Sequence, residues 1–107
     1  MRTMTKAIDR LQAKIMASQT VIMDGGTGTE IPRRGVPIHT DLAWSANANI
    51  TFPDLVREIH RDYIHAGAEI IITNTFSTSR VTLAIDGLSG QTEDINVQSV
   101  RLAMDAR

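Results

Sequence analysis

The chain has 107 residues, a formal net charge of −1, 42% hydrophobic residues and 21% charged residues. This length fits one small domain or part of a larger one, and the charge provides no basic surface for nucleic acid or a membrane. No apolar run approaches the roughly 18 residues of a membrane span, and no signal peptide is expected, so the predicted location is cytoplasmic. The absence of cysteine excludes disulfides, thiolate nucleophiles and cysteine-ligated zinc within this chain.

The first part of the chain is expected to contain a helix, a strand and a shorter helix. An apolar stripe predicts a leading helix over residues 3–17. Residues 20–24 are mostly apolar, which is typical of a parallel strand that is covered on both faces. Residues 30–34 are expected to form a short helix closed by Gly35, and a long loop follows over residues 36–50.

The clearest helix signals come next. Thr51 is a candidate N-cap, Pro53 suits a first turn, and Gly67 is placed to end the helix. Residues 69–73 then predict a second apolar strand.

The rest of the chain is expected to be irregular and then helical. Residues 77–86 predict a broken helical turn and residues 87–91 a turn-rich loop, after which Thr92 opens a last helix. The crossover between the two predicted strands is long enough for a helix, so the strands are expected to be parallel and joined in a right-handed sense.

These elements predict an α/β fold that is incomplete in this chain. A closed eight-stranded barrel of alternating strands and helices needs about 250 residues. We therefore expect a leading helix over residues 1–18 and the first two βα units of a (β/α)8 barrel over residues 19–107. Each strand would have an open edge, so the chain would be a fragment, a truncated product or one part of an assembly.

An acid and three glycines follow the first predicted strand. Asp24 precedes Gly25, Gly26 and Gly28, but the spacing fits neither a P-loop nor a dinucleotide-binding pattern. An acid here would repel phosphate and suits a cationic group, such as the ammonium of an amino acid. A second interpretation stays open, in which Asp24 only accepts hydrogen bonds from the loop's own backbone amides.

Polar residues also follow the second predicted strand. Because parallel strands end at the same rim, Thr73 and Asn74 are expected to lie near the first loop, which favours a ligand site over a purely structural role. Trp44 either walls this pocket or packs on the rim. His60 and His65 would not share a helix face, so no histidine metal site is expected.

Several short segments occur along the chain in a fixed order: residues 24–30, 33–35, 44–46, 53–64, 66–68 and 73–76. In this order they resemble the N-terminal part of the homocysteine S-methyltransferases, from about residue 20 to residue 107. The resemblance implies a (β/α)8 barrel in which zinc binds the homocysteine sulfur as a thiolate. The thiolate then takes a methyl group from a donor such as S-methylmethionine to give methionine.

The resemblance also implies roles for individual residues. Asp24 and Gly25 would bind the amino-acid end of homocysteine, Thr73 and Asn74 would line the pocket, and Trp44 would flank it. The zinc ligands of the family are three cysteines in later strands and loops. This chain would therefore supply substrate-orienting residues but no metal ligand and no catalytic residue, and would be inactive alone.

Two alternatives remain at this point. The chain could be a non-catalytic remnant that associates with a partner chain, or with itself, through uncovered strand edges. It could also belong to a different barrel enzyme with an acid at the rim, such as an aldolase or a lyase. The expected ligands are small molecules, with no nucleic acid and no membrane.

Overall fold

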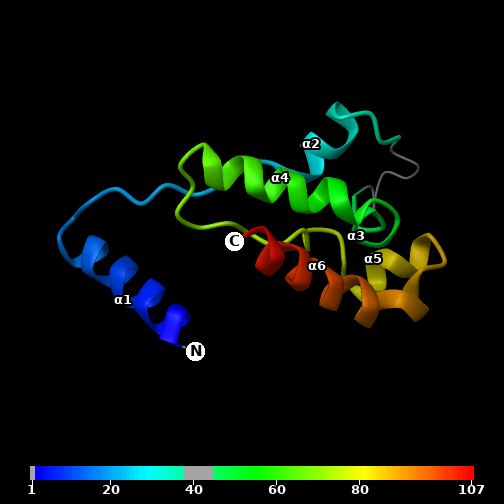
Figure 1. The fold of residues 1–107 in the computed structure, drawn as a ribbon. Coiled ribbons are helices and arrows are strands. Elements are labelled where there is room, and N and C mark those ends of the chain that lie inside the picture. Colours follow the sequence, from blue (N-terminus) through cyan, green and yellow to red (C-terminus); the bar gives the residue numbers. More distant parts are fainter. Residues whose placement is uncertain (1, 38–44) are drawn as a thin grey trace.

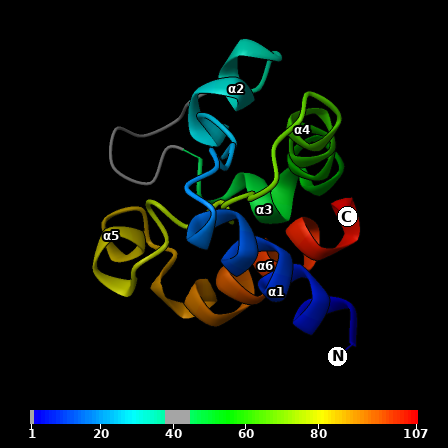
Figure 2. The same cartoon turned by 90° about the vertical axis from the view of Figure 1, so that its left-hand side faces the viewer.

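The computed structural model describes residues 2–37 and 45–107, with side chains from residue 6 onward. The elements of the described chain are α1 (Arg2–Met16), α2 (Thr27–Arg33), α3 (Ala48–Thr51), α4 (Pro53–His65), α5 (Arg80–Ile85), the 3-10 helix η1 (Ser89–Gln91) and α6 (Thr92–Ala106). Figure 1 shows α4 and α6 side by side, with α1 set apart at the end of an extended segment. Figure 2 shows α3 between α2 and α6, at the end of α4. None of the described helices is both long and apolar enough to cross a membrane.

The three long helices lie where the sequence predicted them. In α4, Pro53 occupies the first turn as expected, and Gly67 follows the helix with φ of 115°, which suits a residue without a side chain. The predicted cap is wrong, because Phe52 occupies the N-cap position. The Thr51 hydroxyl instead donates to the carbonyl of Asn47, the N-cap residue of α3, one turn back along the chain.

The shorter helices differ from the prediction in their bounds. Helix α2 begins at Thr27, three residues before the predicted start, and the chain turns at Gly35 with φ of 101°. Helix α3 begins inside the segment predicted to be a loop, at Ala48, and ends at Thr51, the residue predicted as the cap of the next helix. Helix α5 and η1 form in the segments predicted as a broken helical turn and a turn-rich loop.

The two predicted strands are wrong as regular strands within the described chain. Residues 20–24 and 69–73 run parallel, but they share one isolated bridge, between Met23 and Ile70. The amide of Asp24 donates to the carbonyl of Ile70 at 3.0 Å. Two paired segments are only marginally stable unless further strands join them. The described helices therefore do not pack on a regular sheet.

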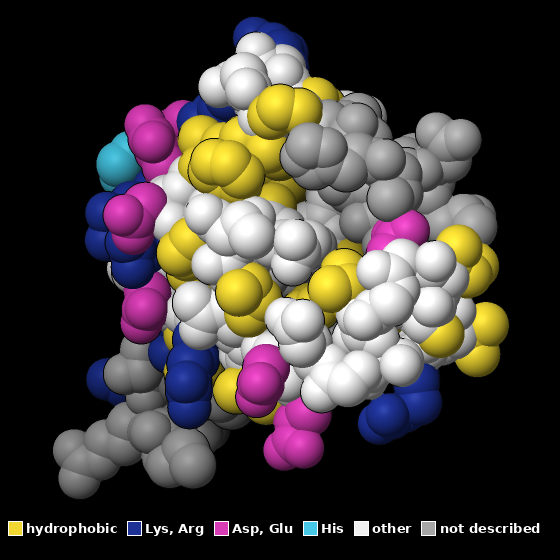
Figure 3. Space-filling model, turned by 90° about the vertical axis from the view of Figure 1, so that its right-hand side faces the viewer, with side chains coloured by type: hydrophobic (Ala, Val, Ile, Leu, Met, Phe, Trp, Pro, Cys, Tyr) yellow, Lys and Arg dark blue, Asp and Glu magenta, His cyan; other side chains and the backbone are white. Residues whose placement is uncertain are grey.

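The core is made by contacts between helices. One buried cluster joins α2, α3, α4 and α6 through Ile31, Ala48, Val56, Ile59 and Leu102. A second cluster lies around Leu83 of α5 and Ile95 of α6. The predicted strand segments stay outside both clusters, and the side chains of Ile22, Met23 and Ile72 are each 51–54% exposed. Hydrophobic side chains also reach the surface on the face that carries α2, α3 and α5 (Figure 3).

Candidate functional site

A pocket of about 300 Å³ lies where the two extended segments end. Its described lining residues come from the loop after the first segment, from Ser45, and from the end of the second segment: Gly25, Gly26, Thr27, Gly28, Thr29, Ser45, Ile72, Thr73, Asn74, Thr75 and Phe76. Three of the predicted site residues, Gly25, Thr73 and Asn74, therefore meet at one pocket. Trp44 lies outside the described residues.

Asp24 is the residue before the lining, and its carboxylate ties the two segments together. Its Oδ2 accepts a hydrogen bond of 2.9 Å from the amide of Ile72. The side chain is partly exposed. An ionised carboxylate has about four acceptor positions, so this bond leaves capacity for a ligand.

Asn74 faces the protein with its polar side chain, although the residue lines the pocket. Its Nδ2 donates to the carbonyl of Ser45 and to Oδ1 of Asn49, both at 3.0 Å. The side chain of Asn49 donates in return to the carbonyl of Asn74 at 3.0 Å. All three residues are buried. This network fixes the end of the second segment against α3. It is also the main interaction of the Asn74 side-chain amide.

Two threonine hydroxyls lie in the pocket wall. Thr73 Oγ1 and Thr75 Oγ1 are 3.0 Å apart, and each can be the donor. Both residues are partly buried. Hydroxyl groups both donate and accept, so this pair can exchange its mutual bond for one to a carboxylate or an ammonium.

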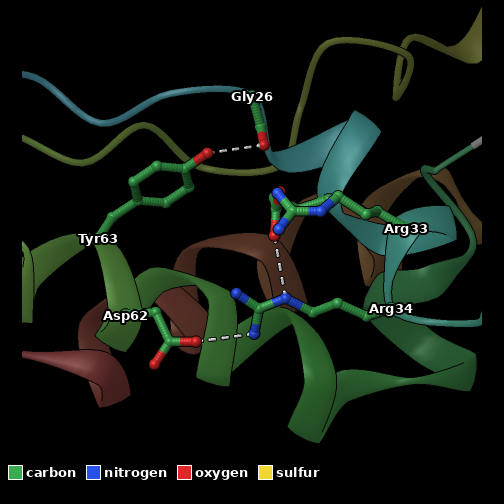
Figure 4. Close-up of polar contacts among 6 residues, drawn as sticks. Gly26, Arg33, Arg34, Asp62 and Tyr63 are labelled. Atoms are coloured by element: carbon green, nitrogen blue, oxygen red, sulfur yellow. Dashed lines mark hydrogen bonds and ion pairs between the residues drawn. The ribbon is translucent and has the colours of Figure 1, made fainter.

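The segment of residues 24–28, called here the glycine loop, consists of the loop before α2 and the first two residues of that helix, and α4 holds it in place (Figure 4). The Tyr63 hydroxyl donates to the carbonyl of Gly26 at 3.0 Å. Glu30 and Asp62 both pair with Arg34, at 3.1 and 2.8 Å, and Asp62 raises the pKa of Arg34 the most. The sequence contained a signal for the helical pair at spacing four, but none for the contact of Tyr63 with the loop.

His60 is fully buried in α4, and neither ring nitrogen has a hydrogen-bond partner among the described residues. Burial lowers the pKa of His60 from its ordinary value of 6.5, and the Asp24 carboxylate opposes this shift. The imidazole is therefore neutral in the folded chain at neutral pH.

This histidine predicts a loss of stability in acid. Below about pH 6.5 the unfolded chain binds a proton that the folded chain does not, so the free energy of unfolding falls by up to ~1.4 kcal/mol per pH unit until the lowered pKa is reached. Urea unfolding at pH 7.5 and 5.5 should show a smaller difference for His60→Phe than for the unmodified chain. His65→Gln, at an exposed position in the last turn of α4, is the control. Equal differences in the His60→Phe variant and the unmodified chain would contradict this assignment.

The described residues do not fit the zinc that the resemblance implies. They contain no group of three or more His, Cys, Asp or Glu side chains that could hold a metal ion. The sequence has no cysteine at any position. A three-cysteine zinc site therefore cannot be built from this chain.

Comparison with known proteins identifies the family. Residues 21–107 match the sequence profile of the homocysteine S-methyltransferases. The chain belongs to this family. The resemblance inferred from the short segments is thereby confirmed, and the aldolase or lyase alternative loses its support.

The relatives are much longer than this chain. "Homocysteine S-methyltransferase 3" of Arabidopsis thaliana is 40% identical over 87 residues, which cover 80% of this chain and 25% of that protein. "Homocysteine S-methyltransferase" of Escherichia coli is 35% identical over 98 residues, 91% of this chain and 31% of that protein. The chain thus spans about a quarter to a third of these homocysteine S-methyltransferases.

A solved structure of the family has a similar fold over the same region. The metallated form of the homocysteine methyltransferase MmuM from E. coli gives a TM-score of 0.74 at 35% identity, over 87% of this chain and 33% of that chain. The backbone of this chain thus follows a homocysteine methyltransferase, although the predicted barrel units lack regular strands in the described residues. The assignment of residues 19–107 to two βα units stays a prediction.

Proposed function

We propose that this chain is the substrate-orienting, N-terminal part of a homocysteine S-methyltransferase. The observation that carries the proposal is the pocket, which joins the glycine loop to Thr73 and Asn74 at the ends of two parallel segments. Its volume of about 300 Å³ suits a small amino acid. Homocysteine has an ammonium, a carboxylate and a thiol. Asp24 and the residues of this pocket are suited to bind the first two.

In this proposal Asp24 binds the ammonium of homocysteine. One carboxylate oxygen of Asp24 is fixed by the amide of Ile72 at 2.9 Å, which holds the side chain in one orientation before any ligand arrives. Backbone groups of the glycine loop and the hydroxyls of Thr73 and Thr75 are the partners offered to the carboxylate. We also propose that Trp44 flanks the pocket.

The thiol would be activated by a zinc site that this chain does not contain. The enzyme of this family would transfer the methyl group of a donor such as S-methylmethionine to homocysteine. This chain alone would bind the substrate without turning it over.

The proposal is tested by comparing binding with turnover. Isotope-labelled chain is titrated with L-homocysteine under reducing conditions while the amide resonances of the glycine loop and residues 72–75 are followed by NMR. We expect saturable shifts in these resonances, and no methionine when S-methylmethionine is added. Shifts spread over the whole chain, or none in the glycine loop, would reject this site.

One observation supports the non-catalytic alternative, in which copies of the chain associate. Ile22, Met23 and Ile72 lie around the single bridge and are each about half exposed, which is costly for apolar side chains. Light scattering over a range of concentrations should therefore show a rising mass for the unmodified chain. Met23→Lys should keep the mass near that of a monomer, since the new charge opposes burial of this face.

A charge at another exposed position controls for solubility. Val81 in α5 is 78% exposed, and Val81→Lys should leave the association unchanged. A folded monomer at every concentration of the unmodified chain would contradict self-association.

A further inference from the structure

Tyr63 contacts the glycine loop from outside the pocket. The residue lies near the C-terminal end of α4 and is not one of the described lining residues. Its hydroxyl donates to the carbonyl of Gly26 at 3.0 Å, and Figure 4 shows the ring reaching from the helix to the loop. The loop carbonyl is thereby fixed to a long helix that belongs to the core.

The ring of Tyr63 also explains the glycine at position 25. A Cβ atom added to Gly25 would lie 2.9 Å from the hydroxyl oxygen and 3.2 Å from Cε1 of Tyr63. The glycines with a left-handed backbone among the described residues are Gly35, Gly67 and Gly87, so backbone conformation does not require glycine here. The close approach of the aromatic ring means instead that a side chain at residue 25 would displace Tyr63.

Asp62, the neighbour of Tyr63 in α4, holds the C-terminal end of the stretch that runs from the glycine loop through α2. Asp62 Oδ2 lies 2.8 Å from Nη1 of Arg34, just after α2, and Nε of Arg34 lies 3.1 Å from Oε2 of Glu30. Two consecutive residues of α4 thus anchor both ends of the stretch that runs from the glycine loop through α2.

We propose that Tyr63 is a positioning residue for the substrate pocket, which sets the place of the Gly25 and Gly26 backbone through its hydroxyl and its ring. The inference rests on the proposed function, because it assigns the loop to homocysteine binding. A simpler role would be packing alone, since Tyr63 also contacts the core cluster. Tyr63→Phe separates the two roles, because it keeps the ring and removes the hydroxyl.

Hydrogen exchange of single amides tests the positioning role. The amide of Asp24 bonds to Ile70 and the amide of Ile72 bonds to Asp24, so both report on the base of the glycine loop. In Tyr63→Phe we expect these two amides to exchange about threefold to tenfold faster, which corresponds to the loss of one hydrogen bond. The amide of Glu69, bonded to Ile22 on the other side of the bridge, should be unchanged.

Asp62→Asn is the matched control, because it weakens the tie to Arg34 and leaves the Tyr63 hydroxyl in place. Its Asp24 and Ile72 amides should exchange as in the unmodified chain. Unchanged exchange in Tyr63→Phe, or an equal increase in Asp62→Asn, would overturn the proposal.

Gly25→Ala tests the ring contact separately. The added methyl should lower the midpoint of thermal unfolding in the presence of Tyr63, and lower it less when Tyr63→Leu removes the ring. Equal losses in the two backgrounds would show that the ring does not set the position of Gly25.

Titration with homocysteine tests whether the position of the glycine loop affects substrate binding. We expect Tyr63→Phe to raise the dissociation constant about threefold to tenfold, in parallel with the faster exchange. Faster exchange with unchanged affinity would overturn the role in the pocket. If the unmodified chain fails to bind homocysteine, the proposed function fails, and the exchange data alone then decide whether Tyr63 positions the loop.

Discussion

Replacing Asn74 with alanine is expected to lower the free energy of unfolding by about 2–4 kcal/mol. The Asn74 side chain satisfies the carbonyl of Ser45 and Oδ1 of Asn49, and all three residues are buried. Truncation would leave the buried Oδ1 of Asn49 without this donor, whereas the Ser45 carbonyl keeps its bond from the amide of Ala48. A buried acceptor without a partner costs more than the net value of a hydrogen bond. Urea unfolding followed by circular dichroism measures the effect.

A second asparagine provides the control. Asn47 is the N-cap residue of α3, is only partly buried, and makes no side-chain capping bond. Asn47→Ala should change the free energy of unfolding by less than about 0.5 kcal/mol. If Asn74→Ala were equally mild while homocysteine affinity fell, Asn74 would belong to the substrate site and not to the scaffold.

The helices could be predicted because their signals are local. Apolar spacing, a first-turn proline and a glycine after the last turn are contained in α4 itself, and the same holds for the acids that open α6. The exact caps could not be predicted, because Thr51 has a competing partner in the carbonyl of Asn47. This competition depends on α3, which the sequence pattern had presented as loop.

The strands could not be predicted reliably because a strand depends on its neighbours. Residues 20–24 and 69–73 have the apolar composition of buried parallel strands, but within the described chain each pairs at a single bridge. A run of apolar residues reports that a segment suits a covered sheet, and it does not report whether the other strands are present.

The pocket was predicted in its position and only partly in its chemistry. The rule that parallel segments end at one rim brought Gly25, Thr73 and Asn74 together. It could not reveal that the amide of Asn74 turns toward Asn49, or that Tyr63 supports the loop, since both contacts join residues distant in sequence. Trp44 lies outside the described residues.

Replacing Asp24 with asparagine is expected to weaken homocysteine binding by about tenfold to a hundredfold, the value of a hydrogen bond between two charged groups. Asparagine keeps an oxygen that can accept from the amide of Ile72, so the tie between the two segments survives. Asp24→Ala would remove both the charge and the tie. The dissociation constants are measured by NMR titration of the chain with L-homocysteine.

A ligand without the ammonium group distinguishes recognition from support. 4-Mercaptobutanoate keeps the thiol and carboxylate of homocysteine but has no ammonium for the Asp24 carboxylate to bind. Its affinity for the Asp24→Asn variant should therefore be the same as, or slightly higher than, its affinity for the unmodified chain. A selective loss for homocysteine would assign the ammonium to Asp24. Unchanged affinity for both ligands in Asp24→Asn, with equal losses for both in Asp24→Ala, would mean that Asp24 acts only by holding residue 72 in place. The second interpretation of the sequence, in which Asp24 has a purely structural role, would then be correct. The amide from which Asp24 accepts its bond belongs to Ile72, across the bridge, and not to the loop of Asp24 itself.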